Sequence, residues 1–577
     1  MAYDGLTMAG ITHELSSWVE ARVEKIYQPA AAVLLISLHH AQQGRAKLLI
    51  SADATGPRLH LTEGKWSNPA APPMFCMLLR KHLEGSRLIA VEQCGLERII
   101  TLSLSGRDDL GNTVTYRLIA EIMGRHSNIL LVSQEDKILD SIVRVPPAMS
   151  SVRMILPGLT YSYPLHQDRL DTLEVQSAEQ LAAALQPEAA IGLSKALVAK
   201  LTGISPQLAT ELLHRANMEA RQAVAETDAG QWNRLYSQLQ SLQAMVRESA
   251  FHPSLSGKHF AALPLTHLPA EPWTGTVNEL VDHVFTETRH AAAIQKQKQR
   301  LSAVARQLLQ KDRRKEANQA EELAAMQQDL ELRRKGELII SSLHLIAPKA
   351  ESARVIDYYD PEMPEVEVSL NPQLNGTQNA QRYFKRYERA RHGIPIVEKN
   401  LAATRAEIAY LDSLLDSIDR ADQTALLTEI EQEMRQSGLL PQPPKGKAPA
   451  ANPSEPLRFT SPDGAEILVG RNNLQNERLT KSASPDDWWL HTKDIPGSHV
   501  LIKGAGSAIS PATLELAAGL AAYFSKARQS SKVPVDYTLR KHVKKPSGSP
   551  PGFVIYTDQQ TVLIEPRAPE GQEPAKE

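Results

Sequence analysis

The stretch LSAVARQLLQKDRRKEANQAEELAAMQQDL, residues 301–330, decides how this chain of 577 residues folds. Apolar residues recur in it at the three- and four-residue spacing of a coiled-coil seam, at Leu301, Val304, Leu308, Leu323, Met326 and Leu330. The run that surrounds it, residues 281–345, contains no proline, and Gly336 is its only glycine. The sequence therefore predicts a long helix with one apolar stripe.

A second helical run, residues 378–436, returns after a connector and carries its own stripe at Ile408, Leu411, Leu415 and Ile418. Two long helices joined in this way predict an antiparallel coiled-coil arm over residues 276–436. At 1.5 Å per residue the arm would extend on the order of 80 to 90 Å, which suits a protein that bridges distant sites on a large partner.

The connector and the start of the second run combine strand-like alternation with a basic, aromatic segment. Residues 366–370 alternate as a strand does, and NAQRYFKRYERAR, residues 379–391, places cations beside tyrosines and a phenylalanine. Cations suit RNA phosphates, and flat side chains suit unstacked bases. A solvated helix with a few core aromatics explains the same window as well. The candidate RNA contacts of this connector are Arg382, Lys385, Arg386 and Tyr387.

The chain before the arm is predicted to form two parts. Residues 1–170 mix helical and strand patterns, which indicates an α+β domain with a largely antiparallel sheet. Residues 171–275 have a helical texture. In the first part, helices are expected at residues 11–23 and 74–82, and strands at residues 32–38, 47–51, 99–104, 113–119 and 128–132.

Within the helical part, GLSKALVAKLTGISPQLATELLHRA, residues 192–216, predicts two short helices around a tight turn. Gly203 permits the reversal, Ser205 suits the cap of the second helix, and Pro206 suits its first position. Such a helix-hairpin-helix points backbone amides at a phosphate, which favours nucleic-acid binding. An ordinary packed helix pair is the alternative.

After the arm, a linker rich in proline and alanine, residues 437–456, precedes a last α+β domain, residues 457–566, and a disordered tail, residues 567–577. A helix is expected from Pro511, capped by Ser510, to about residue 526. Strands are expected at residues 467–469, 499–502, 535–539, 553–557 and 561–564.

The last domain opens with a polar segment, VGRNNLQNERLTKSASPDDWWLHTKDIPGSHV, residues 469–500. Buried Asn and His must find hydrogen-bond partners, so their abundance indicates a polar surface shaped for a ligand. Side chains that cap turns in a loop-rich region are the alternative. RKHVKKPSG, residues 540–548, adds a dense positive patch that can neutralise several phosphates. The candidate RNA contacts of this domain are Arg471, Asn472, Asn473, Trp489, His491, His499, Lys541, Lys544 and Lys545.

Composition restricts the classes of function. The net charge is −2 and the isoelectric point about 6.8, so any nucleic-acid site must be local. Cys76 and Cys94 form no metal-ligand pattern, no secretory start is present, and no apolar run is long enough to span a membrane. The sequence therefore predicts a cytoplasmic protein without a membrane partner, and predicts no metal, cofactor or catalytic residue.

Several rare strings in one order resemble the NFACT family, the group of bacterial RqcH and eukaryotic NEMF proteins. The resemblance covers nearly the whole chain. The strings are Asp4-Gly5, MLLRKHL at residues 77–83, GLERI at 95–99, EIMGRHSNI at 121–129, Leu156-Pro157-Gly158, residues 379–387, and the later strings VGRNN, DWWLH, PGSHV and VKK.

The resemblance implies an N-terminal domain similar to formamidopyrimidine-DNA glycosylases, the helix-hairpin-helix, the coiled-coil arm and a C-terminal RNA-binding domain. It also implies a role in rescue of stalled translation. RqcH-like proteins bind the large (50S) ribosomal subunit that still carries peptidyl-tRNA, recruit alanyl-tRNA, and direct an alanine tail onto the nascent chain without mRNA. The ribosome performs the peptidyl transfer, so the protein is expected to be a tRNA selector rather than an enzyme. A small RNA-binding helper protein is a further partner to consider.

The family also implies residue roles in the N-terminal domain. An acidic residue followed by arginine contacts the tRNA anticodon arm, and Glu97 and Arg98 correspond to that pair, with Glu in place of the usual Asp. A carboxylate can accept from base amino groups, and arginine can donate two parallel hydrogen bonds. Arg125, His126 and Asn128 carry donors that suit the same tRNA surface.

Three other functions compete with this expectation. A DNA glycosylase would need an N-terminal proline nucleophile, and Met1 is followed here by Ala2 and Tyr3. A fibronectin-binding surface adhesin, a description given to homologues, ranks second, although no export signal or wall anchor is visible. A structural coiled-coil protein would leave the cluster of Asn, His and Trp unexplained.

Overall fold

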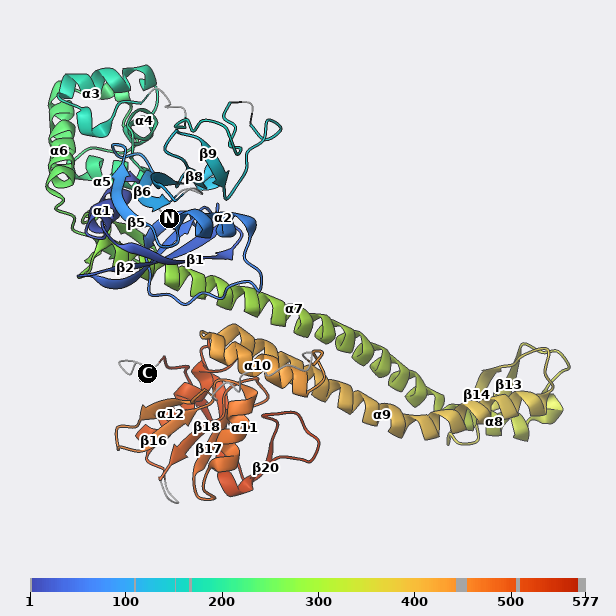
Figure 1. Ribbon diagram of the computed structural model, residues 1–577. Helices are drawn as coiled ribbons and strands as arrows, with labels where there is room; N and C mark the ends of the chain where they lie inside the picture. Colours follow the sequence, from blue (N-terminus) through green and yellow to red (C-terminus); the bar gives the residue numbers. More distant parts are fainter. Residues whose placement is uncertain are drawn as a thin grey trace. The chain divides into compact units, whose positions relative to one another are not determined.

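The chain folds into several regions of mixed α and β structure, as the sequence predicts (Figure 1). The computed structural model describes residues 3–107, 111–150, 152–164, 169–442, 454–504 and 509–568. The chain divides into two compact units, Met1–His290 (unit 1) and Ala291–Glu577 (unit 2). No helix among the described residues is long and apolar enough to cross a lipid bilayer.

Unit 1 is built on a nine-stranded antiparallel sheet in the order β4-β3-β2-β1-β5-β6-β7-β8-β9. Its strands are β1 Arg22–Ala30, β2 Val33–His40, β3 Gly44–Ser51, β4 Arg58–Leu61, β5 Arg87–Gln93, β6 Ile99–Arg107, β7 Thr113–Glu121, β8 Asn128–Val132 and β9 Ile138–Ser141. β1 and β5 share one paired position, Arg22 with Arg87, so two meanders meet at a single point. The strands predicted from alternation correspond to β2, β3, β6, β7 and β8, which confirms them.

Helices α1, Gly5–Ser16, and α2, Met74–Leu83, pack into the core of unit 1. The prediction of a helix over residues 11–23 is wrong at both ends. Asp4 accepts a hydrogen bond from the backbone amide of Thr7 at 3.0 Å, and this cap starts the helix at Gly5. Glu20 has a φ of 74°, a left-handed conformation that a helix cannot continue through, and β1 begins at Arg22.

The helical part of unit 1 follows the sheet and contains the predicted helix-hairpin-helix. The Ser205 side chain accepts from the amide of Leu208, Pro206 is the first residue of α5, and Gly203 has a φ of 72°, so the predicted cap, first position and reversal are confirmed. The elements are α3 Ala178–Leu185, α4 Leu193–Lys200, α5 Pro206–Arg215, α6 Ala229–Glu248, β10 Ser254–Ser256, β11 His259–Ala261 and β12 Glu271–Pro272.

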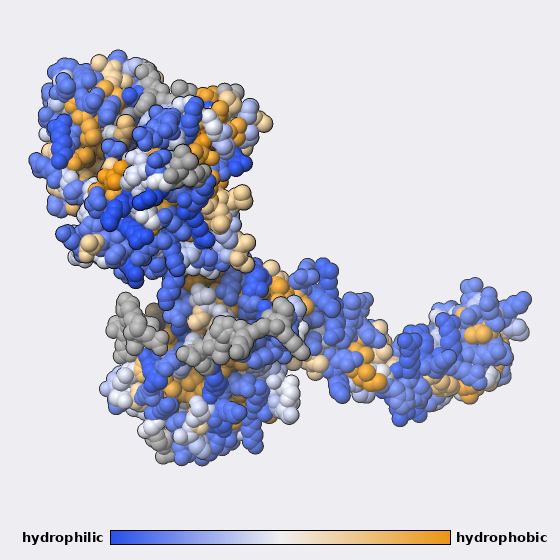
Figure 2. Space-filling model, in the orientation of Figure 1, coloured by the Kyte–Doolittle hydropathy of each residue, from blue (hydrophilic) through white to orange (hydrophobic). Residues whose placement is uncertain are grey.

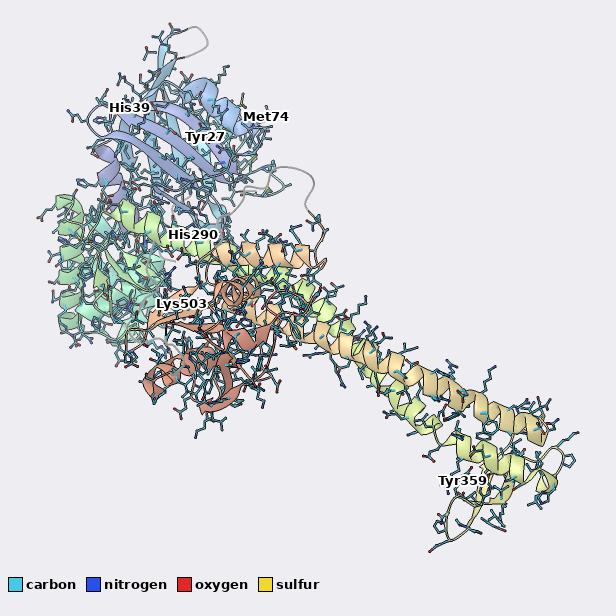
Figure 3. The ribbon with its side chains drawn as sticks, turned by 90° about the horizontal axis from the view of Figure 1, so that it is seen from below. Tyr27, His39, Met74, His290, Tyr359 and Lys503 are labelled. Carbon is cyan, nitrogen blue, oxygen red and sulfur yellow. The ribbon has the colours of Figure 1, made fainter. Side chains whose placement is uncertain are left out.

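The arm consists of α7 Val277–Asp329 and α9 Gly376–Arg420, joined by α8 Leu332–Ser341 and a hairpin of β13 Ser352–Ile356 and β14 Glu365–Ser369. Ion pairs between the two long helices establish that they run antiparallel, because the residue number on α7 falls as that of its partner on α9 rises. These pairs are Asp329 with Arg386 (2.6 Å), Glu316 with Arg405 (2.8 Å) and Arg313 with Asp412 (3.7 Å). Figure 3 labels Tyr359 in the connecting hairpin at the distal end.

Both helical runs of the arm are interrupted where the sequence predicts continuity. A turn separates α7 from α8, and Gly336 then lies so close to Phe384 that an added Cβ would be 2.8 Å from the ring. The second run divides into α9 and α10, Thr424–Gln436, which folds back to pack on the base of the arm. Hydrophilic side chains cover most of the arm's visible surface (Figure 2), as expected for helices that bury one narrow seam.

The last domain of unit 2 contains a six-stranded antiparallel sheet in the order β15-β16-β18-β17-β19-β22. Ser510 caps α12 through the amide of Thr513, as predicted. Much of the predicted linker, residues 443–453, and the tail from residue 569 lie outside the described residues. The elements are β15 Leu457–Thr460, β16 Glu466–Val469, α11 Asn473–Ser482, β17 Trp488–Thr492, β18 Val500–Lys503, α12 Pro511–Tyr523, β19 Val533–Leu539, β20 Val543–Lys544, β21 Ile555–Tyr556 and β22 Gln560–Ile564.

Candidate functional site

Glu97 and Arg98 lie on a cavity of about 840 Å³ in unit 1. Both belong to the loop between β5 and β6, where Glu97 is half-buried and Arg98 is exposed. Segments far apart in the sequence line the cavity: the start of α1, this loop, the helix-hairpin-helix turn and the β10–β11 hairpin. The lining includes Asp4, Gly5, Leu96, Gly203, Ser205, Gln207, Lys258 and His259.

Two glycines hold the Glu97 loop against α1 and the helix-hairpin-helix. A Cβ added at Gly5 would lie 1.8 Å from the carbonyl oxygen of Leu96, and one added at Gly203 would lie 2.2 Å from Leu96 Cβ. No side chain fits at either position, so the three backbones approach each other directly. Leu96, the residue before Glu97, is fully buried at this contact. The carboxylate and guanidinium of the loop are therefore presented from a fixed backbone.

A buried carboxylate also ties α1 to α5. Asp4 Oδ2 accepts a hydrogen bond from Ser205 Oγ at 2.8 Å, while Asp4 Oδ1 accepts from the amide and hydroxyl of Thr7, both at 3.0 Å. Burial raises the pKa of Asp4, and these hydrogen bonds and the charge of Arg98 oppose that shift. Asp4 therefore caps one helix and holds the first turn of another beside the cavity.

The cavity rim carries a lysine and a histidine from the β10–β11 hairpin. Lys258 lies in the two-residue turn between Ser256 and His259 and is exposed. His259 Nδ1 lies 3.2 Å from Gln207 Oε1 on α5. A lysine at the rim beside an acidic and arginine pair suits a ligand with both phosphates and base edges.

The other N-terminal candidates lie outside the lining of this cavity. Arg125 and His126 are exposed on a single 3-10 turn, and Arg125 Nε donates to His126 Nε2 at 3.0 Å. Asn128 is buried and bridges to the backbone of Val143 with both side-chain atoms. RNA contact by these residues stays a prediction, and Arg125 and His126 are the members with exposed side chains.

In unit 2, Asn472 and Asn473 join the C-terminal sheet to the base of the arm. Asn472 Nδ2 donates to Glu429 Oε2 at 2.7 Å, and Asn473 Nδ2 donates to Glu433 Oε1 at 3.0 Å. Both asparagines are buried, and Asn472 also caps α11. Their neighbour Arg471 forms an ion pair with Asp422 in the turn between α9 and α10. These three residues therefore position the C-terminal domain on the arm.

Glu433 of α10 is the acceptor at the centre of that junction. Its Oε1 accepts from Tyr410 at 2.9 Å as well as from Asn473, while its Oε2 is buried without a hydrogen-bond partner in the described part of the chain. Burial raises the pKa of Glu433 to about 7, although the hydrogen bonds from Asn473 and Tyr410 act to lower it. The junction therefore contains a carboxylate that changes charge near neutral pH.

Trp489, His491 and His499 form an aromatic cluster inside the last domain. The rings of Trp489 and His491 are stacked with centroids 5.8 Å apart, and His499 meets both edge-on. Burial lowers the pKa of His491 to about 4 and holds that of His499 well below its usual value. Trp489 is fully buried. The cluster is neutral and belongs mainly to the packing of the domain, so direct RNA contact by it stays a prediction.

The cations after β19 remain at the surface. Lys541 and Lys544 are exposed, whereas Lys545 forms an ion pair of 2.7 Å with Glu477 on α11. The first two are therefore the members of this group best placed to reach a phosphate.

The basic and aromatic candidates of the connector lie in the first turns of α9. Arg382 and Lys385 are exposed, and Arg386 forms an ion pair with Asp329. The guanidinium of Arg333 lies over the ring of Tyr387, 5.9 Å from its centroid. Their contact with RNA stays a prediction.

Sequence reasoning missed several residues of the cavity. Asp4 and Ser205 are 201 positions apart, and no local pattern indicates that their side chains meet. Lys258 and His259 belong to a short hairpin without a recognisable motif. Gly203 was the usable signal, since a glycine at a tight turn between two short helices points to a close approach.

A family model of the NFACT N-terminal and middle domains matches residues 4–452, and a model of the NFACT protein RNA-binding domain matches residues 456–557. The chain is 37% identical over 583 residues to the Rqc2 homolog RqcH of Bacillus subtilis, covering 98% of both chains. It is 34% identical over 571 residues to the Rqc2 homolog RqcH of Streptococcus suis, again covering 98% of both.

Among solved structures, the N-terminal part of the fibronectin/fibrinogen-binding protein from Streptococcus suis is 31% identical to this chain. It covers 50% of this chain and 100% of that structure, with a TM-score of 0.42.

Proposed function

Because this chain belongs to the NFACT family, we propose that it is a ribosome-associated quality control factor. It binds stalled large ribosomal subunits that carry peptidyl-tRNA, recruits alanyl-tRNA, and directs alanine tailing of the nascent chain without mRNA. The tail marks the chain for degradation. The relatives named Rqc2 homolog RqcH, matched over 98% of their length, support this role.

The observation that carries the proposal is the fixed presentation of Glu97 and Arg98 on the unit 1 cavity. The close approach of Gly5, Leu96 and Gly203 sets the backbone of this pair. An accepting carboxylate and a donating guanidinium on adjacent residues can read a base edge, because the two groups match its donors and acceptors. We assign this cavity to the tRNA anticodon arm.

The protein acts in this scheme by binding and positioning, while the ribosome performs peptidyl transfer. The cavity supplies hydrogen bonds and charge to hold a tRNA. The arm, whose α9 alone has 45 residues and a length of about 70 Å, offers a second, extended surface for contacts with the subunit.

A co-purification experiment tests the proposal. The tagged protein would be recovered from its host at moderate salt and the bound RNA sequenced, for wild type and for Glu97→Ala/Arg98→Ala. A matched control is Glu92→Ala/Arg107→Ala, which removes the same two charges from exposed positions on β5 and β6.

We expect large-subunit rRNA and one tRNA family with the wild type and the control. The tRNA should be lost from the Glu97/Arg98 variant while the rRNA remains. If none of the three proteins brought rRNA with it, the ribosomal role would be contradicted and the fibronectin-binding alternative favoured. Retention of the tRNA by the Glu97/Arg98 variant would contradict the assignment of the cavity.

A further inference from the structure

The part of α7 that lies in unit 2 carries a concentration of positive charge. The segment KQKQRLSAVARQLLQKDRRK, residues 296–315, has Asp312 as its only acidic residue. The whole chain has a net charge of −2, so this segment departs strongly from the average. Its cations are Lys296, Lys298, Arg300, Arg306, Lys311, Arg313, Arg314 and Lys315.

Three of these cations are neutralised by acids of the neighbouring helices. Arg300 pairs with Glu431 of α10. Arg313 pairs with Asp412 and Lys315 with Glu407 of α9, both at 3.7 Å. These pairs help to hold α7 against its neighbours, as ion pairs flanking a helical seam do.

The other five cations of the segment form no ion pair with a residue that the structure describes, and three of these border hollows on the helix. Arg306, Lys311 and Arg314 are exposed, and none of them forms an ion pair or a side-chain hydrogen bond with any residue that the structure describes. Leu301, which packs in the seam of the same helix, is fully buried. The unpaired charges are therefore exposed to solvent outside this seam.

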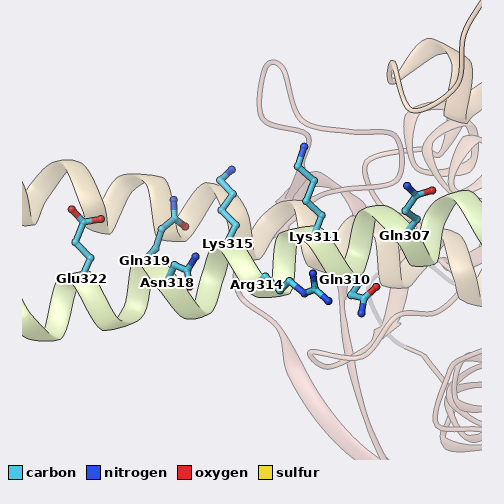
Figure 4. A pocket seen from close by; sticks show the side chains of 8 residues that line it. All are labelled: Gln307, Gln310, Lys311, Arg314, Lys315, Asn318, Gln319 and Glu322. Carbon is cyan, nitrogen blue, oxygen red and sulfur yellow. The ribbon is translucent and has the colours of Figure 1, made fainter.

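The unpaired cations border two shallow hollows along α7. One has a volume of about 510 Å³ and includes Lys311 and Arg314, and the other has about 430 Å³ and includes Arg306 and Arg314. Figure 4 shows the side chains that line the first hollow. They are three cations, four amides and, at one end, a single acid: Lys311, Arg314, Lys315, Gln307, Gln310, Asn318, Gln319 and Glu322. The row from Arg306 to Arg314 is about 12 Å long at the rise of an α-helix.

We propose that this face of α7, defined by Arg306, Lys311 and Arg314, binds the sugar-phosphate backbone of a structured RNA. A nucleic-acid duplex carries a negative charge about every 1.7 Å of axis, so a 12 Å row of cations meets several phosphates. The amides of Gln307 and Gln310 can donate to phosphate or sugar oxygens. No aromatic side chain lines either hollow, so base stacking plays no part and the contact is independent of sequence. The inference rests on the proposed function for the presence of RNA partners, ribosomal RNA or tRNA.

Salt-dependent binding of an RNA duplex tests the proposal with the full-length protein. Arg306→Gln/Lys311→Gln/Arg314→Gln would be compared with the wild type by fluorescence anisotropy over a series of salt concentrations. The matched control, Lys296→Gln/Lys298→Gln/Arg300→Gln, removes the same charge from the same helix at positions that line neither hollow. Circular dichroism melts would establish that both variants are folded.

The slope of log K against log salt should fall by about two to three for the first variant, because each lost phosphate contact lowers it by about one. The control should change the slope by less than about one. An equal loss in both variants would show a bulk charge effect and overturn the proposal, as would an unchanged slope in the first variant.

Purified tRNA and purified large ribosomal subunits would identify the source of the RNA. A tenfold or greater loss of affinity for either one in the first variant supports the proposal and names the partner, and a loss for neither overturns it. A failure of this proposal and a failure of the proposed function can be distinguished, because duplex binding is measured without ribosomes. A loss of duplex binding in this variant would support the α7 face even if no ribosomal RNA co-purified with the wild type.

Discussion

Replacing Glu433 with glutamine should stabilise unit 2 at alkaline pH and change its stability little in acid. Glu433 is fully buried between Tyr410 and Asn473, and its Oε2 has no hydrogen-bond partner among the described residues. Burial raises its pKa from 4.5 to about 7. The folded state therefore holds a proton that the unfolded state has already released, so stability falls as pH rises from about 4.5 to 7.

The size of the effect follows from that pKa. Each pKa unit corresponds to 1.36 kcal/mol, so ionised Glu433 costs about 3 kcal/mol more in the folded than in the unfolded state. Glutamine has nearly the same shape and does not titrate. The difference in stability between variant and wild type should therefore be about 3 kcal/mol more favourable to the variant at pH 8 than at pH 4.5.

Hydrogen exchange of the α10 amides at the two pH values measures the local free energy of opening without assuming that the whole chain unfolds in one step. Glu431→Gln is the matched control on the same helix. Burial acts to raise the pKa of Glu431, but hydrogen bonds from Arg435 and Arg300 lower it overall, so its neutralisation should destabilise the helix at neutral pH. A difference between Glu433→Gln and wild type that is the same at both pH values would refute the reasoning.

Other predictions address the cavity, unit 1 and the last domain. Gly203→Ala should destabilise unit 1 by about 1–3 kcal/mol and release tRNA, because the added Cβ would lie 2.2 Å from Leu96 Cβ and the φ of Gly203 is 72°. Thermal melts measure the loss of stability, and sequencing of co-purified RNA measures the loss of tRNA. An unchanged melt would argue against the close approach. Glu211→Gln should lower the melting temperature at pH 7 and have little effect near pH 2. Burial acts to raise the pKa of Glu211, but hydrogen bonds from His267, Thr266 and Arg215 lower it overall to about 2. The ionised carboxylate therefore stabilises the fold above about pH 4.5, and this stabilisation is lost as the pH falls toward 2. Calorimetry at both pH values checks this, and equal destabilisation at each would contradict it. Lys541→Ala/Lys544→Ala should weaken RNA binding equally for all sequences and reduce the slope of log K against log salt by about two. Lys545→Ala is the control, because the ammonium of Lys545 is paired with Glu477. A change in sequence preference would count against phosphate contact.

Local signals in the sequence predicted those parts of the fold that depend on neighbouring residues. Ser205 and Pro206 mark the start of α5 because a cap and a first-turn proline act within one helical turn. The arm was predictable because its seam repeats over many turns. Its breaks were not, since the close contact of Gly336 with Phe384 joins separate helices.

The candidate site was less predictable because the role of a polar residue depends on what it meets. Asn473 and Asn472 looked like ligand contacts, but their partners Glu433 and Glu429 lie 40 and 43 positions earlier, on another helix. The unpaired row on α7 is equally hidden, because Arg306 and Arg313 are indistinguishable in sequence until the position of Asp412 is known.

The C-terminal composition of stalled nascent chains tests the central claim most directly. A reporter without a stop codon would be expressed in host cells that lack this protein, complemented with wild type, Glu97→Ala/Arg98→Ala or Glu92→Ala/Arg107→Ala, and its C-terminal peptides analysed by mass spectrometry. The account predicts extensions of alanine alone with the wild type and with the Glu92/Arg107 control, and none with the Glu97/Arg98 variant or without the protein. Alanine extensions that persist without the protein, or their absence with the wild type, would contradict it.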